Sequence, residues 1–293
     1  MTTNQTMATL GIAVEITART IQIGEVARMV SERGYSSIFV SEHTHIPVDS
    51  KSVSPSGVPR DWVKRIPDPY VTLAAAAATT DLEVGTFVAL PAQHEPIVLA
   101  KAIATLDQLS GGRFVLGVGW GWHREEFENI THKPPNERVP MLIEKLEAMR
   151  RLWTDEEAEY TGDYVQIQKS WSWPKPARPG GPPVLLGANG TTRNFQRIVK
   201  WADGWIPQMS GLYSEAFPAE LDELRRLWRE AGRGASGPDI TVSHMPGSAD
   251  DVRKGLERAN QLGIKRVLVR IVEERMEDFE AIVDEIAQAI PGR

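Results

Sequence analysis

A histidine directly after a short apolar segment is the first candidate for chemistry in this sequence. Ser41, Glu42 and His43 follow the β-branched and aromatic segment 37–40. Histidine accepts and donates protons near neutral pH, so His43 is a candidate acid–base group, and Glu42 would hold its tautomer or hydrogen-bond a bound ring. A packed, hydrogen-bonded pair is the commoner situation for a lone histidine. His45 would point the same way as His43 on a strand, but nothing nearby completes a ligand set, so no metal site is predicted.

Alternating glycines mark the second candidate. The segment Gly117-Val118-Gly119-Trp120-Gly121-Trp122 ends an apolar run that begins at Phe114. Backbone without side chains lets a flat ring or a phosphate approach the main chain, and Trp120 and Trp122 could stack on that ligand or exclude water. A tight turn whose tryptophans fill the mouth of a barrel explains the pattern equally well. We interpret the charged cluster 124–126 that follows as a solvated helix start, where acidic residues favour the helix dipole.

A loop of small residues between a strand and a helix is the third candidate. Gly187, Ala188, Asn189, Gly190 and Thr191 follow an apolar run. Free backbone N–H groups and the helix dipole at such a turn bind anions, so the loop is a candidate phosphate site. An ordinary loop with Thr191 as helix cap is the alternative. Since the sequence lacks a GxSxG motif and a P-loop lysine motif, we interpret the site as one that holds a cofactor.

The candidates all follow strand-like segments that alternate with helix-like ones. Strands are predicted over 10–16, 37–40, 84–90, 114–118, 184–186, 205–206, 240–243 and 267–271, and an amphipathic helix over 138–153. Eight strands, each followed by a helix, indicate an α/β protein with a (β/α)8 TIM barrel, in a single domain over 1–293, whose site lies at the carboxyl ends of the strands. An open doubly wound sheet is the second choice, weakened because no GxGxxG follows the first strand.

Two long segments interrupt the alternation. Residues 45–67 are rich in Pro and Ser. Residues 154–183 form a predicted insertion, with a hairpin-like stretch at 160–167 and then Trp171-Ser172-Trp173-Pro174. Long loops in compact domains are more often functional than not, so we expect both segments to decorate the barrel.

Composition limits the classes of function. The 293 residues include no cysteine, which excludes disulfides, thiolate metal sites and a cysteine nucleophile. The formal net charge is −6 and there is no basic tract, which argues against nucleic-acid binding. The N-terminus lacks the layout of a signal peptide, and no apolar run approaches the roughly 20 residues that span a membrane. We therefore expect a cytoplasmic protein with a small-molecule substrate and no membrane partner.

Several of these segments resemble the luciferase-like monooxygenase family, and the branch that uses coenzyme F420 in particular. The resemblance covers nearly the whole chain. It is carried by Ser41-Glu42-His43, Val84-Gly85-Thr86, the block from Leu106 to Phe114, Gly117 to Trp122 with Glu126-Phe127, and Ala202-Asp203-Gly204-Trp205.

The resemblance implies a barrel with an insertion that often forms homodimers. It implies a non-proline cis peptide bond at Phe87–Val88 that supports the ring of F420, an 8-hydroxy-5-deazaflavin. It further implies that Ser41 to His43 face the ring's edge, that Gly187 to Gly190 receive the phosphate, and that a hydride passes between the ring and an organic substrate.

Two departures from the family pattern refine this expectation. Trp120 stands where many flavin-dependent members have an arginine and where the sugar-phosphate dehydrogenases have a catalytic glutamate, which weakens both of those assignments. Trp171 and Trp173 add aromatic side chains that we expect to form a lid over the substrate pocket. The alternatives are an FMN-dependent monooxygenase that uses O2 and a separate reductase, and a non-catalytic carrier of the cofactor.

Overall fold

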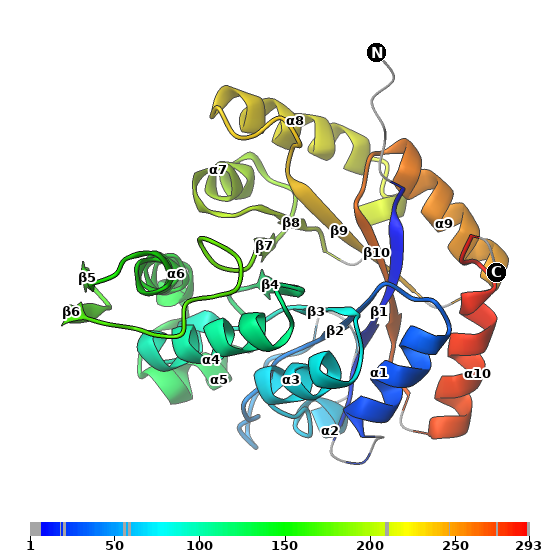
Figure 1. The fold of residues 1–293 in the computed structure, drawn as a ribbon, viewed down its shortest axis with the longest axis horizontal. Helices are drawn as coiled ribbons and strands as arrows, with labels where there is room; N and C mark the ends of the chain where they lie inside the picture. The colour runs from blue at the N-terminus through cyan, green and yellow to red at the C-terminus, as the bar shows by residue number, and fades with distance from the viewer. Residues whose placement is uncertain are drawn as a thin grey trace.

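Eight parallel strands close into a barrel (Figure 1). The computed structural model describes residues 7–17, 19, 22–54, 57, 60–208, 211–245, 247–273 and 275–291. The strands stand in the order β1, β10, β9, β8, β7, β4, β3, β2 around the barrel. They are β1 (Thr9–Val14), β2 (Ser37–Val40), β3 (Glu83–Thr86), β4 (Phe114–Val118), β7 (Val184–Gly187), β8 (Gly204–Ile206), β9 (Asp239–His244) and β10 (Arg266–Ile271). The predicted (β/α)8 barrel is confirmed, and the open sheet is excluded.

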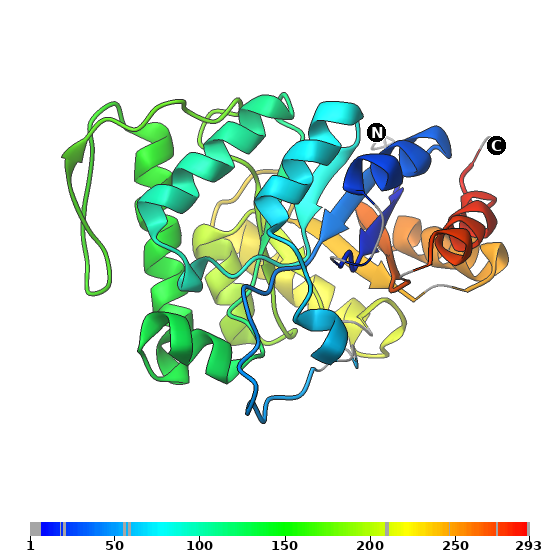
Figure 2. The same cartoon turned by 90° about the horizontal axis from the view of Figure 1, so that it is seen from below.

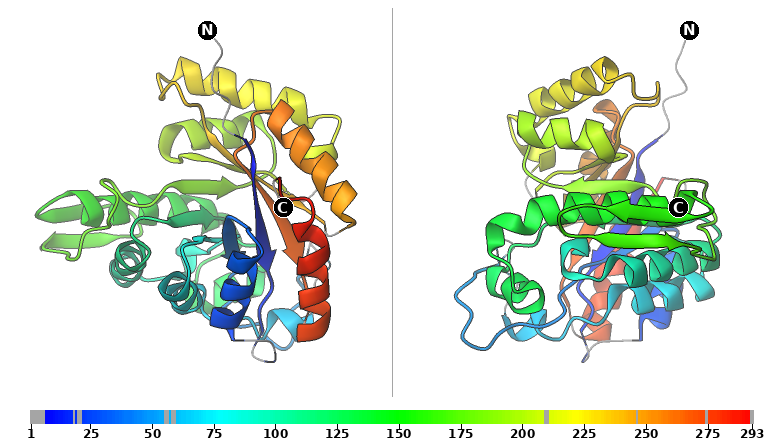
Figure 3. Two further views of the ribbon diagram at one scale, coloured as in Figure 1. Left: turned by 45° about the vertical axis from the view of Figure 1, so that its right-hand side comes forward. Right: turned by 90° about the vertical axis from the view of Figure 1, so that its left-hand side faces the viewer.

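Helices surround the barrel on the outside (Figure 3). They are α1 (Ile23–Glu32), α2 (Arg60–Val63), α3 (Pro69–Thr79), α4 (Pro96–Leu109), α5 (Arg124–Thr131), α6 (Arg138–Thr154), α7 (Thr192–Trp201), α8 (Phe217–Glu230), α9 (Ala249–Gln261) and α10 (Met276–Ala287). Several begin at a side-chain cap: Asp68 accepts from the N–H of Val71 in α3, and Ser248 forms a capping box with Asp251 in α9. None of the described helices is long and apolar enough to cross a membrane.

The strands are apolar because both of their faces are covered. Residues facing outward pack under the helices, and Ala13, Phe39, Val115, Leu185, Ile206 and Leu268 form a separate cluster inside the barrel. Phe87 and Val88 pack on this inner cluster. At the amino end the interior holds Arg266, paired with Glu83 at 2.5 Å and placed over the Phe39 ring. The interior of the barrel is therefore a packed core. Its layer at the carboxyl ends of the strands forms the base of a ligand site at that end.

Strand β3 ends earlier than the sequence predicts. It was expected to run to residue 90, but its ladder ends at Thr86. The next peptide bond, Phe87–Val88, is cis, as the resemblance implies. Ala89 then makes a single parallel bridge to Val118. The chain therefore leaves the barrel wall at 87–88, above the inner cluster.

The two long segments lie in different places. Residues 45–67 follow β2, and they therefore start at the carboxyl ends of the strands; Trp62 of this segment donates to the carbonyl of Glu15, at 3.1 Å. Residues 154–183 instead follow helix α6, so they return toward the amino ends. They contain the expected hairpin, as antiparallel β5 (Ala158–Thr161) and β6 (Gln166–Ser170), which extends outside the barrel (Figure 2).

The expected aromatic lid is corrected by this placement. Trp171 and Trp173 follow the hairpin, and their side chains are 73% and 55% exposed. The carbonyl of Trp173 accepts from Lys101 on the outer face of α4. Neither tryptophan lines the pocket at the carboxyl ends, because a segment between a helix and the next strand runs at the other end of a barrel.

Candidate active site

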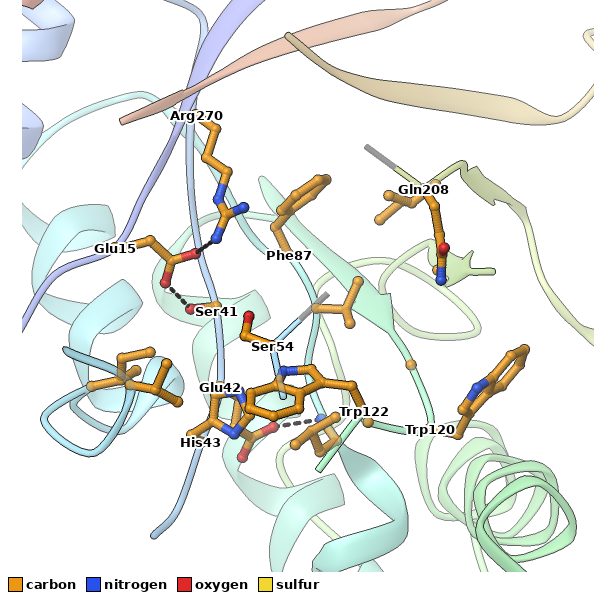
Figure 4. Close-up of a pocket in the computed structure, with 18 of the residues that line it drawn as sticks. Glu15, Ser41, Glu42, His43, Ser54, Phe87, Trp120, Trp122, Gln208 and Arg270 are labelled. Atoms are coloured by element: carbon orange, nitrogen blue, oxygen red, sulfur yellow. Dashed lines mark hydrogen bonds and ion pairs between the residues drawn. The ribbon is translucent and has the colours of Figure 1, made fainter. Parts of the chain in front are cut away.

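An open pocket lies at the carboxyl ends of the strands (Figure 4). Its volume is about 260 Å³. Most of its lining is apolar: Val63, Ile66, Phe87, Val88, Leu90, Trp120, Trp122, Ile206 and Pro207, with Gly119, Gly121 and Gly187. The polar side chains in the lining are Glu15, Ser41, Glu42, His43, Ser54, Gln208 and Arg270. A concave, mostly apolar pocket with a few polar groups is the usual form of a small-molecule site.

His43 lines this pocket, and its partner is Glu126. Nδ1 of His43 lies 2.7 Å from Oε2 of Glu126, a carboxylate that also accepts from the N–H of Thr44 at 2.9 Å. Because a carboxylate accepts, the ring bears a proton on Nδ1 and has Nε2 left for a ligand. The Trp122 ring packs edge-on against His43, with ring centroids 5.2 Å apart.

Two sequence interpretations are corrected here. Glu42 does not hold His43, and Glu126 is not a solvated residue at a helix start: its side chain is 0% exposed. Glu126 turns inward because His123 caps α5, its Nδ1 accepting from the N–H of Glu126 at 3.1 Å. The glycine segment after β4 leads the chain past β3, so that the first turn of α5 lies beside the end of β2. The pattern of charges along the sequence does not predict this position.

The same helix start fixes the segment after β2. The carboxylate of Glu125 accepts from the hydroxyl of Ser52 at 2.5 Å and from the N–H of Lys51 at 2.8 Å. These two hydrogen bonds lower the pKa of Glu125 to about 2. The hydroxyl of Ser50 lies 2.7 Å from Nε2 of His123. Helix α5 therefore holds residues 50–52 next to the pocket mouth, where Ser54 contributes to the lining.

Glu42 points to the opposite side of β2 and fixes the segment that follows β3. Its carboxylate accepts from the N–H of Leu90 at 2.6 Å and lies 2.5 Å from Nε2 of His94. Burial alone would lower the pKa of His94, but the hydrogen bond and the charge of Glu42 outweigh it and raise that pKa. Lys145 of α6 donates to the carbonyls of Ala92 and His94. Glu42 thus positions the wall that carries Phe87, Val88 and Leu90.

A buried ion pair closes the pocket where the first and last strands meet. Nη2 of Arg270, near the carboxyl end of β10, lies 2.8 Å from Oε1 of Glu15, which follows β1. The hydroxyl of Ser41 donates to Oε2 of Glu15 at 2.5 Å (Figure 4). Ser41 was a sequence candidate, whereas Glu15 and Arg270 were not among the site residues expected from the sequence. Their pairing depends on closure of the barrel between chain ends 255 residues apart.

The glycines of the candidate segments have a packing reason that the sequence did not show. A Cβ on Gly117 would lie 2.1 Å from the carbonyl oxygen of Thr86. A Cβ on Gly119 would lie 2.7 Å from Cγ2 of Val88, and one on Gly187 would lie 2.9 Å from its Cγ1. The glycines therefore let the end of β3 approach β4 and β7. Gly119 and Gly187 line the pocket as well, while Gly117 is not part of the described lining.

The small-residue loop leads into helix α7 beside the pocket. Thr191 caps the helix by accepting from the N–H of Asn194, at 3.3 Å. Ala188, Asn189, Gly190 and Thr191 are outside the lining that the described residues form. Arg197, on the second turn of α7, lies over the Trp120 ring, 5.9 Å from its centroid. The carboxylate of Glu220, from α8, lies where a Cβ on Gly190 would be, and burial raises its pKa.

The site can move protons and can hold a flat apolar ligand. Within the described part of the chain, no three His, Asp or Glu side chains gather as they would around a metal ion. The His43–Glu126 pair is a base or an acid at the wall of an apolar pocket, and the nearby helix amino end suits an anionic tail.

Comparison with known proteins assigns the family. A family model described as luciferase-like monooxygenase matches residues 4–285. An uncharacterized protein of Mycobacterium tuberculosis is 40% identical over 283 residues, which cover 94% of this chain and 96% of that protein. The F420-dependent glucose-6-phosphate dehydrogenase of Nakamurella multipartita is 31% identical over 82% of this chain and 66% of that enzyme. A crystal structure of a monooxygenase from Streptomyces bottropensis shares the fold, with a TM-score of 0.79, 18% identity, and coverage of 96% and 98%. The chain belongs to the luciferase-like monooxygenase family.

Proposed function

We propose that this member of the luciferase-like family is an oxidoreductase that transfers a hydride between coenzyme F420 and a small organic substrate. The observation that carries the proposal is the His43–Glu126 pair at the wall of an apolar pocket. Such a pair moves protons, while the electrons must come from a bound cofactor. A relative aligned over 82% of this chain is named as F420-dependent, which favours the deazaflavin.

The residues present fit a flat ring with a phosphate-bearing tail. Gly119, Gly121 and Gly187 leave a wall with little side-chain bulk beside Val88, and Trp120 lies at the edge of the same pocket. The amino end of α7, with Arg197 near it, would hold the phosphate. Glu220 opposes an anion there, since its carboxylate lies against Gly190.

F420, when bound, supplies or accepts the hydride. Nε2 of His43 takes the proton from an alcohol during oxidation, or gives a proton to the carbonyl oxygen during reduction. Glu126 fixes the tautomer and the orientation of the ring through Nδ1, and its charge stabilises the imidazolium. Trp122 and the segment held by Glu125 keep water away from the reacting atoms.

The rival assignment is an FMN-dependent monooxygenase supplied by a separate reductase. The pocket has room for either ring, but Trp120 stands where many flavin-dependent members have an arginine, so we expect weaker binding of FMN. Oxygen use also distinguishes the two, since a deazaflavin does not activate O2. Reduced F420 should be oxidised by one of a panel of small carbonyl compounds under strictly anaerobic conditions. Product formation that requires FMN and O2 would contradict the proposal, and so would cofactor binding without turnover on any acceptor or donor of the panel.

We also propose that the protein is a homodimer joined through α3 and α4. Both helices expose apolar side chains on their outer faces: Val71, Ala75 and Ala78 on α3, and Ile97 and Val98 on α4. Contiguous exposed apolar residues mark association surfaces. Size-exclusion chromatography with light scattering should give a dimer for the native chain and a monomer for Val98→Glu. A monomeric native chain at tens of micromolar would contradict the proposal.

A further inference from the structure

The charged side chains of the pocket limit the charge that its ligand can have. The described lining contains two carboxylates, those of Glu15 and Glu42, and one guanidinium, that of Arg270. His43 is the remaining ionisable group of the described lining. The other contributors are mostly apolar. The described part of the lining therefore carries at least as much negative as positive charge.

The guanidinium is paired through Nη2 with a carboxylate inside the protein. Arg270 and Glu15 are both buried, and Nη2 lies 2.8 Å from Oε1. The second oxygen of Glu15 accepts from Ser41 at 2.5 Å, which holds the carboxylate in place. An anionic ligand that took Arg270 for itself would leave the carboxylate of Glu15 buried beside it without its cation. Breaking a buried pair by removing one partner is strongly unfavourable, because the remaining charge is poorly solvated.

We propose that Glu15 masks the charge of Arg270 and thereby makes the pocket selective for an uncharged, largely apolar substrate, such as a ketone, an enone or an alcohol. Carboxylates and phosphate esters of the same shape are rejected. The charge preference of the pocket does not depend on the proposed function. The statement that the preferred ligand is the substrate rests on the proposed function.

The physical basis is a difference in charge at constant shape. A neutral carbonyl group can accept a hydrogen bond from His43 when that ring is protonated, and its apolar remainder packs on side chains such as Val63, Ile66 and Trp122. An anion gains little from Arg270, whose charge Glu15 offsets, and is repelled by Glu42. Selectivity of this kind comes from the repulsive element as much as from attraction.

A matched pair of probes tests the proposal without knowledge of the natural substrate. Benzamide and benzoate have nearly the same shape and differ in charge. Their dissociation constants are measured by ligand-observed NMR titration, on the protein without cofactor and again in the presence of saturating F420. The native chain should bind benzamide at least about tenfold more tightly than benzoate, a difference of about 1.4 kcal/mol. Equal or tighter binding of benzoate, or no binding of benzamide, would overturn the proposal.

Two isosteric variants distinguish the effect of the Glu15–Arg270 pair from the effect of the total negative charge of the pocket. Glu15→Gln keeps the shape and unmasks Arg270, so it should shift the preference toward benzoate by at least about tenfold. Glu42→Gln also removes one negative charge but leaves the Glu15–Arg270 pair intact, so its shift should be several times smaller. Equal shifts in the two variants would show that Arg270 is not the group being masked.

The results of the benzamide and benzoate titrations can be told apart from a failure of the F420 proposal. The measurement on cofactor-free protein gives the preference even if F420 does not bind, so failure of the F420 proposal leaves the probe ratio interpretable. Conversely, tight F420 binding together with a preference for benzoate would retain the proposed function and reject this substrate class. The ratio for the native chain decides the matter even if Glu15→Gln does not fold.

Discussion

The glycines around the pocket offer the sharpest test of the packing argument. If Gly119 is required because Val88 fills the space above it, then Gly119→Ala should destabilise the fold whether or not a ligand is present. The added Cβ would lie 2.7 Å from Cγ2 of Val88, a contact that forces a β-branched side chain or its backbone to move. Overpacking of this kind costs about 1–3 kcal/mol.

The neighbouring glycine should behave more severely. A Cβ on Gly117 would lie 2.1 Å from the backbone oxygen of Thr86, which cannot rotate away. We expect Gly117→Ala to cost roughly 4 kcal/mol or more, in the range reserved for a few well-defined mechanisms. Gly24 of α1 is the matched control, because a Cβ there meets only Thr79 at 3.8 Å. Gly24→Ala should be neutral or slightly stabilising, since alanine favours a helix.

Removal of the obstacle should rescue the first variant. Val88→Ala deletes Cγ2, the methyl group that a Cβ on Gly119 would approach, so the double variant should be more stable than the sum of the single effects by about 0.5–3 kcal/mol. Urea and thermal unfolding give these free energies, with a shift of roughly 2–4 °C per kcal/mol. Full stability of Gly119→Ala, or no coupling with Val88→Ala, would refute the reasoning and return the glycine to a ligand-contact role.

Three further predictions follow from the contacts of the site. His43→Ala should lower turnover by roughly 10²–10⁴-fold with cofactor affinity nearly unchanged; Glu126→Gln should lower it by roughly 10–100-fold, because a charged hydrogen-bond acceptor becomes a neutral one. Steady-state kinetics that change KM alone would contradict both effects. Because its pKa is raised in the folded state, His94 contributes stability that is complete below the ordinary histidine value of 6.5 and is lost as the pH rises through the raised value. The unfolding free energies of the native chain and His94→Gln should therefore differ most in acid and converge in alkali, and a gap that widens with pH in urea titrations would be inconsistent with the Glu42–His94 pair. Glu220→Gln should tighten binding of F420 and FMN by about fivefold, since a carboxylate near Gly190 repels a phosphate; an unchanged dissociation constant would place the phosphate elsewhere.

The sequence predicted the barrel well because its signal is repetitive. Parallel strands covered on both faces appear as short apolar runs, and the predicted bounds 37–40 and 114–118 agree with β2 and β4. The alternation with helices then leaves few topologies. The end of β3 was missed because nothing in the local pattern of residues 87–90 distinguishes a strand from the bent segment that follows one.

Local residue patterns did not predict the contacts between elements that are far apart in the sequence. Sequence neighbours suggested Glu42 as the partner of His43, but successive residues of an extended segment point to opposite sides, so the two face different neighbours. Glu126 lies 83 residues from His43 and reaches it through the cap made by His123. Trp171 and Trp173 were placed at the pocket by composition, although the connection from α6 directs their segment to the outside.

A fluorescence titration of the purified, cofactor-free protein with F420, and separately with FMN, determines which cofactor it binds. We expect saturable, tight binding of F420 and weak or no binding of FMN. Tight binding of FMN with no binding of F420 would contradict this expectation and direct the search toward oxygen-dependent chemistry.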